Sequence, residues 1–199
     1  MLAAHLVPGY FAVVATKSRW RPVWTPAQQL VLWGVALAST VLPDADVVYN
    51  ALFRGFFNHS WLWTHSVFLY LALAILWWIL RRWNQFAAMI LGLMVLGGFS
   101  HLLLDVIAHG TPLFYPLTPL MIGSPSMRVT QIGVLGYLTD PVFLLEPLLI
   151  TIAVIHWIVN STLPIRVRVV GSIICINILI MFAVGFLMLL PQLQSRISG

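Results

Sequence analysis

Carboxylate and imidazole side chains are few in this sequence, and they are the types that bind divalent metal ions. The chain has five carboxylates and six histidines, which are Asp44, Asp46, Asp105, Asp140, Glu146, His5, His59, His65, His101, His109 and His156. Imidazole nitrogen and carboxylate oxygen are common protein ligands of zinc and similar ions. If the fold brings several of them together, they would form a metal site that could activate water for hydrolysis.

The first candidate pair is His101 and Asp105, which are four residues apart. Side chains at i and i+4 share one face of a helix, so both could bind one ion. His109 continues this stripe at i+8, and Gly110 and Pro112 predict that the helix ends there. The alternative is a hydrated His–Asp pair at an outward-facing helix end.

The second candidate is the acidic segment Leu42–Asp46. Pro43 predicts that the preceding helix ends or bends at this point. In an extended segment Asp44 and Asp46 would point to opposite sides, so one could bind metal while the other orients a ligand or a water molecule. The alternative is an ordinary acidic turn.

The third candidate is His65, in the tripeptide Thr64–Ser66 directly before an apolar stretch. Thr64 or Ser66 could cap the helix that follows. The alternative is a histidine at the membrane interface with no ligand role. Only the joint placement of the three candidates favours a site.

The composition indicates an integral membrane protein. The chain has 199 residues, of which 61% are hydrophobic and 8% are charged, whereas soluble domains carry roughly 25% charged residues. The net charge of +5 is interpreted as a signal of topology and of contact with anionic lipid, and no nucleic-acid partner is predicted. Cys175 is the only cysteine and excludes an intrachain disulfide.

Six apolar stretches predict an all-α, polytopic helical bundle with about five to six membrane segments. They are 2–16, 27–43, 66–80, 86–107, 141–159 and 167–190. The fourth and sixth are long enough to cross the bilayer, whereas the first could be tilted or re-entrant. We predict one membrane domain over 1–199, with the motifs in 1–120 and C-terminal helices in 132–190.

The Lys and Arg residues alternate between the loops that these stretches define. After the successive stretches they number three, one, two, one, two and one. The positive-inside rule therefore places the first, third and fifth loops in the cytoplasm. The candidate ligands then meet at the outer face, because each of the first five stretches has one of them at or beside its outer end.

Known catalytic signatures are absent from the sequence. It has no His-Glu-x-x-His, no Gly-x-Ser-x-Gly and no Walker phosphate loop. The common zinc proteases, the serine hydrolases with a nucleophile elbow and the P-loop enzymes are therefore excluded.

The order of the motifs resembles the membrane-bound metal-dependent hydrolases of YdjM type, which are associated in bacteria with the LexA damage response. The matching elements are His5, Leu42–Asp46, Thr64–Ser66 and Gly97–Asp105. The resemblance covers residues 5 to about 120. That family has been likened to zinc-dependent phospholipase C and nuclease P1. The likeness implies a multi-zinc site whose ligands are His5, Asp44 or Asp46, His65, His101 and Asp105.

One departure from the family concerns a phosphate-binding arginine. The family often has His-Arg shortly before its Thr-His-Ser, whereas His59 here is followed by Ser60. Arg54 or Arg128 could take that place. His59, Arg54 and Arg128 are therefore the substrate-binding candidates.

The resulting hypothesis is a hydrolase of the cytoplasmic (inner) membrane with two or more Zn²⁺ ions, or another divalent metal, at the extracytoplasmic interface. Its substrate would be an ester or phosphodiester of a lipid-like molecule. Asp44 or Asp46 would accept the proton of the attacking water, and Asp140 is a further catalytic candidate. The alternatives are a non-catalytic metal-binding protein, an ion or proton transporter, and an interaction protein whose LexA association is only regulatory.

Overall fold

The computed structural model describes residues 4–20, 23–55, 62–123, 145–162 and 164–197. Beyond the first three residues, the chain divides into two compact units, residues 4–124 and 125–199. His59, Arg128 and Asp140 lie outside the described residues. That both units form one membrane domain stays a prediction from the sequence.

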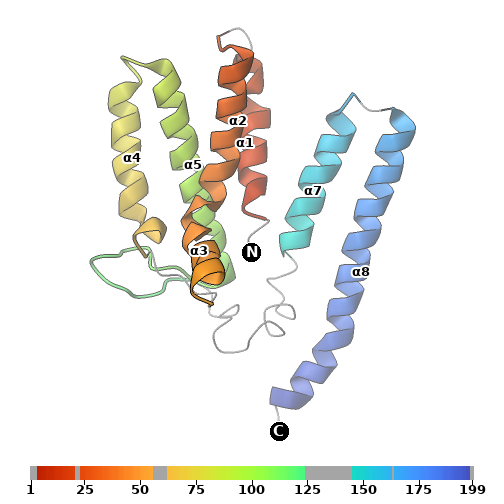
Figure 1. Cartoon of the computed structure of the whole chain (residues 1–199). Helices are drawn as coiled ribbons and strands as arrows, with labels where there is room; N and C mark the ends of the chain where they lie inside the picture. Colours follow the sequence, from red (N-terminus) through yellow and green to blue (C-terminus); the bar gives the residue numbers. More distant parts are fainter. Residues whose placement is uncertain (1–3, 21–22, 56–61, 124–144, 163, 198–199) are drawn as a thin grey trace. The chain divides into compact units, whose positions relative to one another are not determined.

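The regular elements of the described residues are all helices, as predicted (Figure 1). The first unit contains α1 (Leu6–Trp20), α2 (Pro26–Val41), η1 (Leu42–Asp44), α3 (Ala45–Phe53), η2 (Leu62–His65), α4 (Val67–Leu80) and α5 (Gln85–Ala108). The second unit contains α7 (Leu145–Asn160) and α8 (Ile165–Ile197). Each of the six predicted apolar stretches corresponds to one helix, whereas α3 was not predicted.

Two segments of the described chain are long and apolar enough to cross a membrane, Pro26–Asn50 and Gln85–Ala108. The predicted count of five to six membrane segments is therefore not confirmed. As predicted, α2 ends close to Pro43, at Val41, but the apolar segment is longer than the second predicted stretch because η1 and α3 follow without a gap. Pro43 occupies an early position of the turn η1, where a missing N–H is tolerated, and the chain continues directly into α3.

Polar caps define where the helices of the first unit begin. Thr25 and Gln28 form a capping box ahead of α2. The Ser66 hydroxyl accepts a hydrogen bond from the Phe68 amide at the start of α4, which confirms one of the two predicted caps. Asn84 caps α5 through the Ala87 amide.

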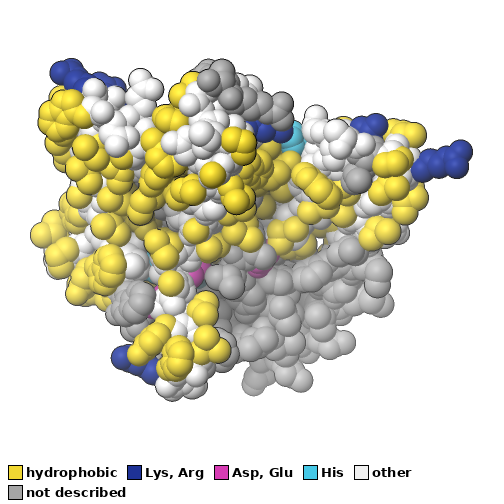
Figure 2. Space-filling view, turned by 45° about the horizontal axis from the view of Figure 1, so that its top comes forward, with side chains coloured by type: hydrophobic (Ala, Val, Ile, Leu, Met, Phe, Trp, Pro, Cys, Tyr) yellow, Lys and Arg dark blue, Asp and Glu magenta, His cyan; other side chains and the backbone are white. Residues whose placement is uncertain are grey.

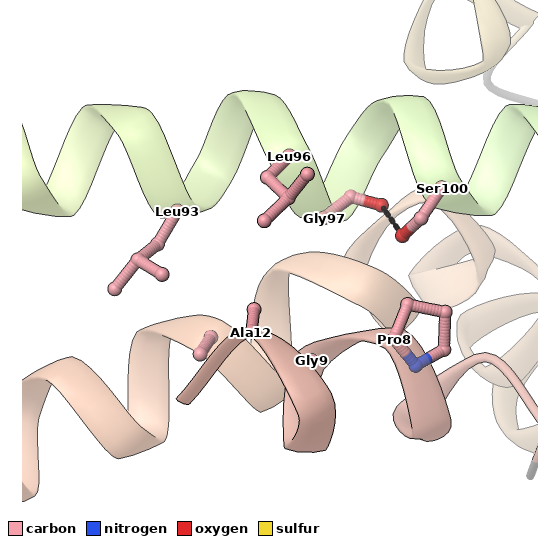
Figure 3. Close-up of a pocket in the computed structure, with 8 residues that line it drawn as sticks. Pro8, Gly9, Ala12, Leu93, Leu96, Gly97 and Ser100 are labelled. Atoms are coloured by element: carbon pink, nitrogen blue, oxygen red, sulfur yellow. Dashed lines mark hydrogen bonds between the residues drawn. The ribbon is translucent and has the colours of Figure 1, made fainter. Parts of the chain in front are cut away.

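Glycines allow three helices to approach closely (Figure 3). A Cβ atom on Gly9 of α1 would lie 2.3 Å from the Ala36 carbonyl oxygen of α2. A Cβ atom on Gly97 of α5 would lie 2.1 Å from the Ser39 hydroxyl, which itself donates a hydrogen bond to the Leu93 carbonyl. Small residues permit such contacts between membrane helices, where backbone approach and hydrogen bonds replace the hydrophobic effect.

The end of this bundle where α1 ends and α2 begins has an apolar core, and basic side chains lie on its surface. Its buried core consists of Val13, Trp20, Leu32, Ala36 and Leu93. The surface between the two ends is largely hydrophobic, and the Lys and Arg side chains gather at its margins (Figure 2). This pattern suits helices that face lipid and end in the interface.

A loop after α5 closes the opposite, polar end of the first unit. Its ends pair through hydrogen bonds between Thr111 and Ile122. The Leu113 carbonyl accepts a bond from the Val67 amide, and the Tyr115 carbonyl accepts one from the Ser66 hydroxyl. The loop therefore holds the beginning of α4, and with it the turn η2.

Candidate metal centre

Four buried residues from three parts of the chain meet at this polar end. Asp44 ends η1, His65 ends η2, and His101 and Asp105 lie one turn apart near the end of α5. Their ligand atoms all lie within 4.8 Å of one another. The prediction that distant motifs converge at one end of the bundle is confirmed, because α2 runs towards that end, α4 runs away from it and α5 returns to it (Figure 1).

Five of the six distances within this four-residue group are close to those of a small tetrahedral ion site. His101 Nε2 lies 3.1 Å from Asp105 Oδ2, 3.4 Å from Asp44 Oδ1 and 3.4 Å from His65 Nε2. His65 Nε2 lies 3.4 Å from Asp44 Oδ1 and 3.6 Å from Asp105 Oδ2. Metal–ligand bonds of roughly 2.0–2.2 Å place tetrahedral ligands about 3.3–3.6 Å apart. The donor set and its spacing therefore fit zinc or a similar divalent ion.

Hydrogen bonds to Nδ1 turn both histidines towards this centre. His101 Nδ1 lies 2.8 Å from the Thr40 carbonyl oxygen, which can only accept, so Nδ1 carries the proton. The Thr64 hydroxyl donates to the Pro43 carbonyl and can accept from His65 Nδ1 at 3.1 Å. In the neutral imidazoles, Nε2 is then the unprotonated nitrogen that faces the carboxylates. Such outer hydrogen bonds fix the tautomer and the ring orientation of metal-binding histidines.

Tyr70 supports η2 from the side of α4. Its hydroxyl donates a hydrogen bond to the Thr64 carbonyl at 2.8 Å. The ring packs against Gly98 so closely that a Cβ atom there would lie 1.8 Å from a ring carbon. Gly98 therefore provides the space that Tyr70 needs to hold the segment that carries His65.

Two further histidines contact the other oxygen of Asp105. Asp105 Oδ1 lies 3.2 Å from His5 Nε2 and 3.1 Å from His109 Nε2. The His5 ring also stacks on the His101 ring, with the centroids 4.1 Å apart. His5, predicted as a ligand, thus lies beside the four-residue group. His109 caps α5 and joins the site as well, although the motifs gave it no role.

His109 lies just beyond the apolar segment that ends at Ala108. Burial lowers the pKa of its imidazole, but the hydrogen bond and the charge of Asp105 outweigh burial, so the pKa is raised above its ordinary value. The cationic form of His109 therefore suits an ion pair with Asp105.

The structure separates the two predicted aspartates. Asp46 is fully buried in the first turn of α3 but is not one of the four residues of the group. The prediction of an extended segment is wrong, because Asp44 and Asp46 lie in consecutive helical turns. The two side chains still point in different directions, because a helix rotates by about 200° over two residues.

The remaining predicted residues lie away from the group or outside the described residues. Arg54 is exposed at the end of α3, and its guanidinium carbon lies 5.4 Å from the centre of the Tyr49 ring. Glu146 lies in the first turn of α7, in the second unit. No side chain that could bind phosphate is therefore assigned.

Comparison with known proteins agrees with the resemblance read from the motifs. The family model described as YdjM inner membrane protein matches residues 1–190. No curated protein and no solved structure matches the chain. Because the family model covers nearly the whole sequence, including all four residues of the candidate metal site, the chain belongs to the YdjM inner membrane protein family.

Proposed function

We propose that this protein is a metal-dependent hydrolase of the inner membrane, with one Zn²⁺ or similar ion held by Asp44, His65, His101 and Asp105. The observation that carries the proposal is the set of five nitrogen–oxygen and nitrogen–nitrogen distances between 3.1 and 3.6 Å among these buried side chains. Burying carboxylates and imidazoles at the end of apolar helices costs free energy unless they are paired or bind a metal.

Asp44 and Asp105 have different roles in the proposed hydrolysis. When bound, a divalent ion would act as a Lewis acid on an ester or phosphoryl oxygen. Asp44 has the most exposed side chain of the four, at 11%, and it lies at the break between two helices. We assign the second carboxylate oxygen of Asp44, Oδ2, to accept the proton of the attacking water, because Oδ1 is the oxygen that faces His65 and His101. Asp105 is fixed by four imidazoles and serves as the anchor.

The site is proposed to face the extracytoplasmic side. Arg81 and Arg82 directly follow α4, at the end opposite His65, and Lys17 lies near the end of α1, opposite His5. Basic residues concentrate on the cytoplasmic side of membrane proteins. This charge pattern supports an outward-facing metal site at the level of the lipid headgroups.

A structural metal site is the second candidate. Four protein ligands can complete a tetrahedron, whereas a catalytic zinc keeps one position open. A structural ion would stabilise the protein without supporting hydrolysis. Transport has less support, because the core at the other end of the bundle is apolar over Val13, Trp20, Leu32 and Leu93.

Metal content and hydrolysis, measured on the same samples, test the proposal. Protein purified in detergent without chelator or metal resin would be analysed by plasma mass spectrometry, as wild type, His101→Ala and the control His156→Ala. His156 lies in α7, in the second unit. We expect about one ion per chain in the wild type and the control and none in His101→Ala.

Two results would contradict the proposal in different ways. An ion retained in His101→Ala would place the metal elsewhere. A stoichiometric ion without hydrolysis of carboxylic esters or phosphodiesters, tested on a panel of lipid substrates, would favour the structural role.

A further inference from the structure

We propose that an apolar pocket beside the metal site binds an acyl chain of the substrate, which makes the substrate a lipid. The inference rests on the proposed hydrolase function. The pocket has a volume of about 330 Å³ and lies among α2, η1, η2, α4 and α5. That volume falls within the range of small-molecule sites, roughly 300–1,000 Å³.

The pocket begins directly behind two of the metal-binding residues. Its lining includes Pro43 and Thr64, the residues immediately before Asp44 and His65. The Thr64 hydroxyl donates to the Pro43 carbonyl at 3.1 Å, so these two lining residues hold together the segments that carry Asp44 and His65. A molecule in the pocket therefore ends next to the metal ligands.

The walls leave little for a polar ligand to bind. Leu42, Leu69, Leu73 and Met94 provide apolar surface. The three hydroxyl groups in the lining already donate within the protein, because Ser39 donates to the Leu93 carbonyl, Thr64 to the Pro43 carbonyl and Tyr70 to the Thr64 carbonyl. The preferred occupant is therefore a hydrocarbon.

The shape and the surroundings of the pocket favour an acyl chain over other hydrocarbons. Leu69 and Leu73 lie one helical turn apart, so the pocket follows the axis of α4 away from the metal-binding end. Trp63 and Leu42 are 54% and 56% exposed, so the lining reaches the surface of the first unit. Tryptophan is enriched at the membrane–water interface, so Trp63 suits a pocket that opens at the level of the lipid headgroups. A lipid lying there would put its ester or phosphodiester group near the four-residue group.

Photolabelling tests the pocket without relying on hydrolysis. Protein purified without chelator and placed in nanodiscs would be exposed to phosphatidylglycerol with a diazirine in its acyl chain, and the labelled peptides would be identified by mass spectrometry. The variants are Leu73→Trp and Met94→Trp, which fill the pocket from two different helices. The control is Leu71→Trp, at an exposed position of α4 that does not line the pocket.

We expect label in the segments of Leu42, Leu69 and Met94 of the wild type. Labelling of these segments should fall about fivefold or more in both pocket variants, the factor that corresponds to roughly 1 kcal/mol of lost contact. The control should match the wild type. Metal binding, measured separately, should persist in all three variants and show that they are folded.

The outcomes separate the pocket from the hydrolase. Uniform labelling of lipid-facing segments, unchanged by Leu73→Trp and Met94→Trp, would overturn the acyl-chain site even if the protein hydrolyses soluble esters. Pocket labelling that both variants block, in a protein with no hydrolytic activity, would support the acyl-chain site and overturn the proposed function.

Discussion

The Thr64 hydroxyl donates a hydrogen bond to the Pro43 carbonyl across 3.1 Å and thereby joins two segments that each carry a candidate metal ligand. The same hydroxyl lies 3.1 Å from His65 Nδ1. One side chain therefore fixes both the position of the Asp44 turn and the tautomer of His65.

Replacing Thr64 with Val should weaken metal binding, because the isosteric side chain can neither donate to Pro43 nor accept from His65. Loss of such an outer contact typically lowers metal affinity about 10- to 100-fold. Competition with a chromogenic chelator would measure the change. Thr16→Val is the control, since the Thr16 hydroxyl bonds only within α1, to the Ala12 and Val13 carbonyls. Equal affinity in both variants would remove Thr64 from the site.

Gly98→Ala should destabilise the protein, because the new methyl group would collide with the Tyr70 ring. Overpacking of this kind costs about 1–3 kcal/mol. Gly34→Ala is the matched control, with nothing within 4 Å of the added methyl. The control should gain about 0.5–1 kcal/mol from helix propensity. Thermal unfolding in detergent would compare the two, and a stable Gly98→Ala protein would contradict the packing of Tyr70 on α5.

His109→Ala should lower the affinity for metal without changing the number of ions per chain. His109 contacts Asp105 Oδ1, whereas the four-residue group uses Oδ2. Its removal therefore loosens the anchor carboxylate, with an expected loss of about 10- to 100-fold in affinity. Plasma mass spectrometry would count the ions. Two ions in the wild type and one in the variant would instead support the two-metal centre predicted from the sequence, with Asp105 as the bridge.

Removing the metal should destabilise the first unit, because Asp44 and Asp105 would lose the charge that offsets their burial. At a free-ion concentration of about a hundred times Kd, binding contributes roughly 2.7 kcal/mol. The Tm should therefore fall with chelator and recover when Zn²⁺ is added back. In His101→Ala the chelator should have no effect, and an equal shift there would show that the stabilising ion binds elsewhere.

The proposed extracytoplasmic position of the site predicts which surface a membrane-impermeant maleimide can reach in intact cells. In a Cys175→Ser background, Trp63→Cys would report the metal-binding end and Trp83→Cys the turn between α4 and α5. Both tryptophans are exposed, at 54% and 79%. Only Trp63→Cys should react before the cells are opened, and the reverse result would place the site in the cytoplasm.

Two helices of the first unit, α4 and α5, follow closely from local sequence, whereas α1 lies four residues later than predicted and α3 was not predicted. Continuous apolar runs, with Ser66 as a candidate cap, predicted α4 and α5 to within one residue at each end. The ligand group could also be predicted. Successive helices alternate in direction, so every second loop between them lies on the same side of the membrane. His101 and Asp105 needed only the helical repeat to lie on one face.

The tertiary structure decided the parts that depend on contacts between distant segments. Sequence did not predict that the chain stays helical through Pro43, which turns Asp44 rather than Asp46 into the group. It did not reveal that Thr40 and Thr64 orient the two imidazoles, whereas the i+4 spacing had already placed His109 on the helix face of Asp105. The reason is physical: periodicity and capping act within a few residues, whereas a tautomer or a choice between two carboxylates depends on partners from other helices.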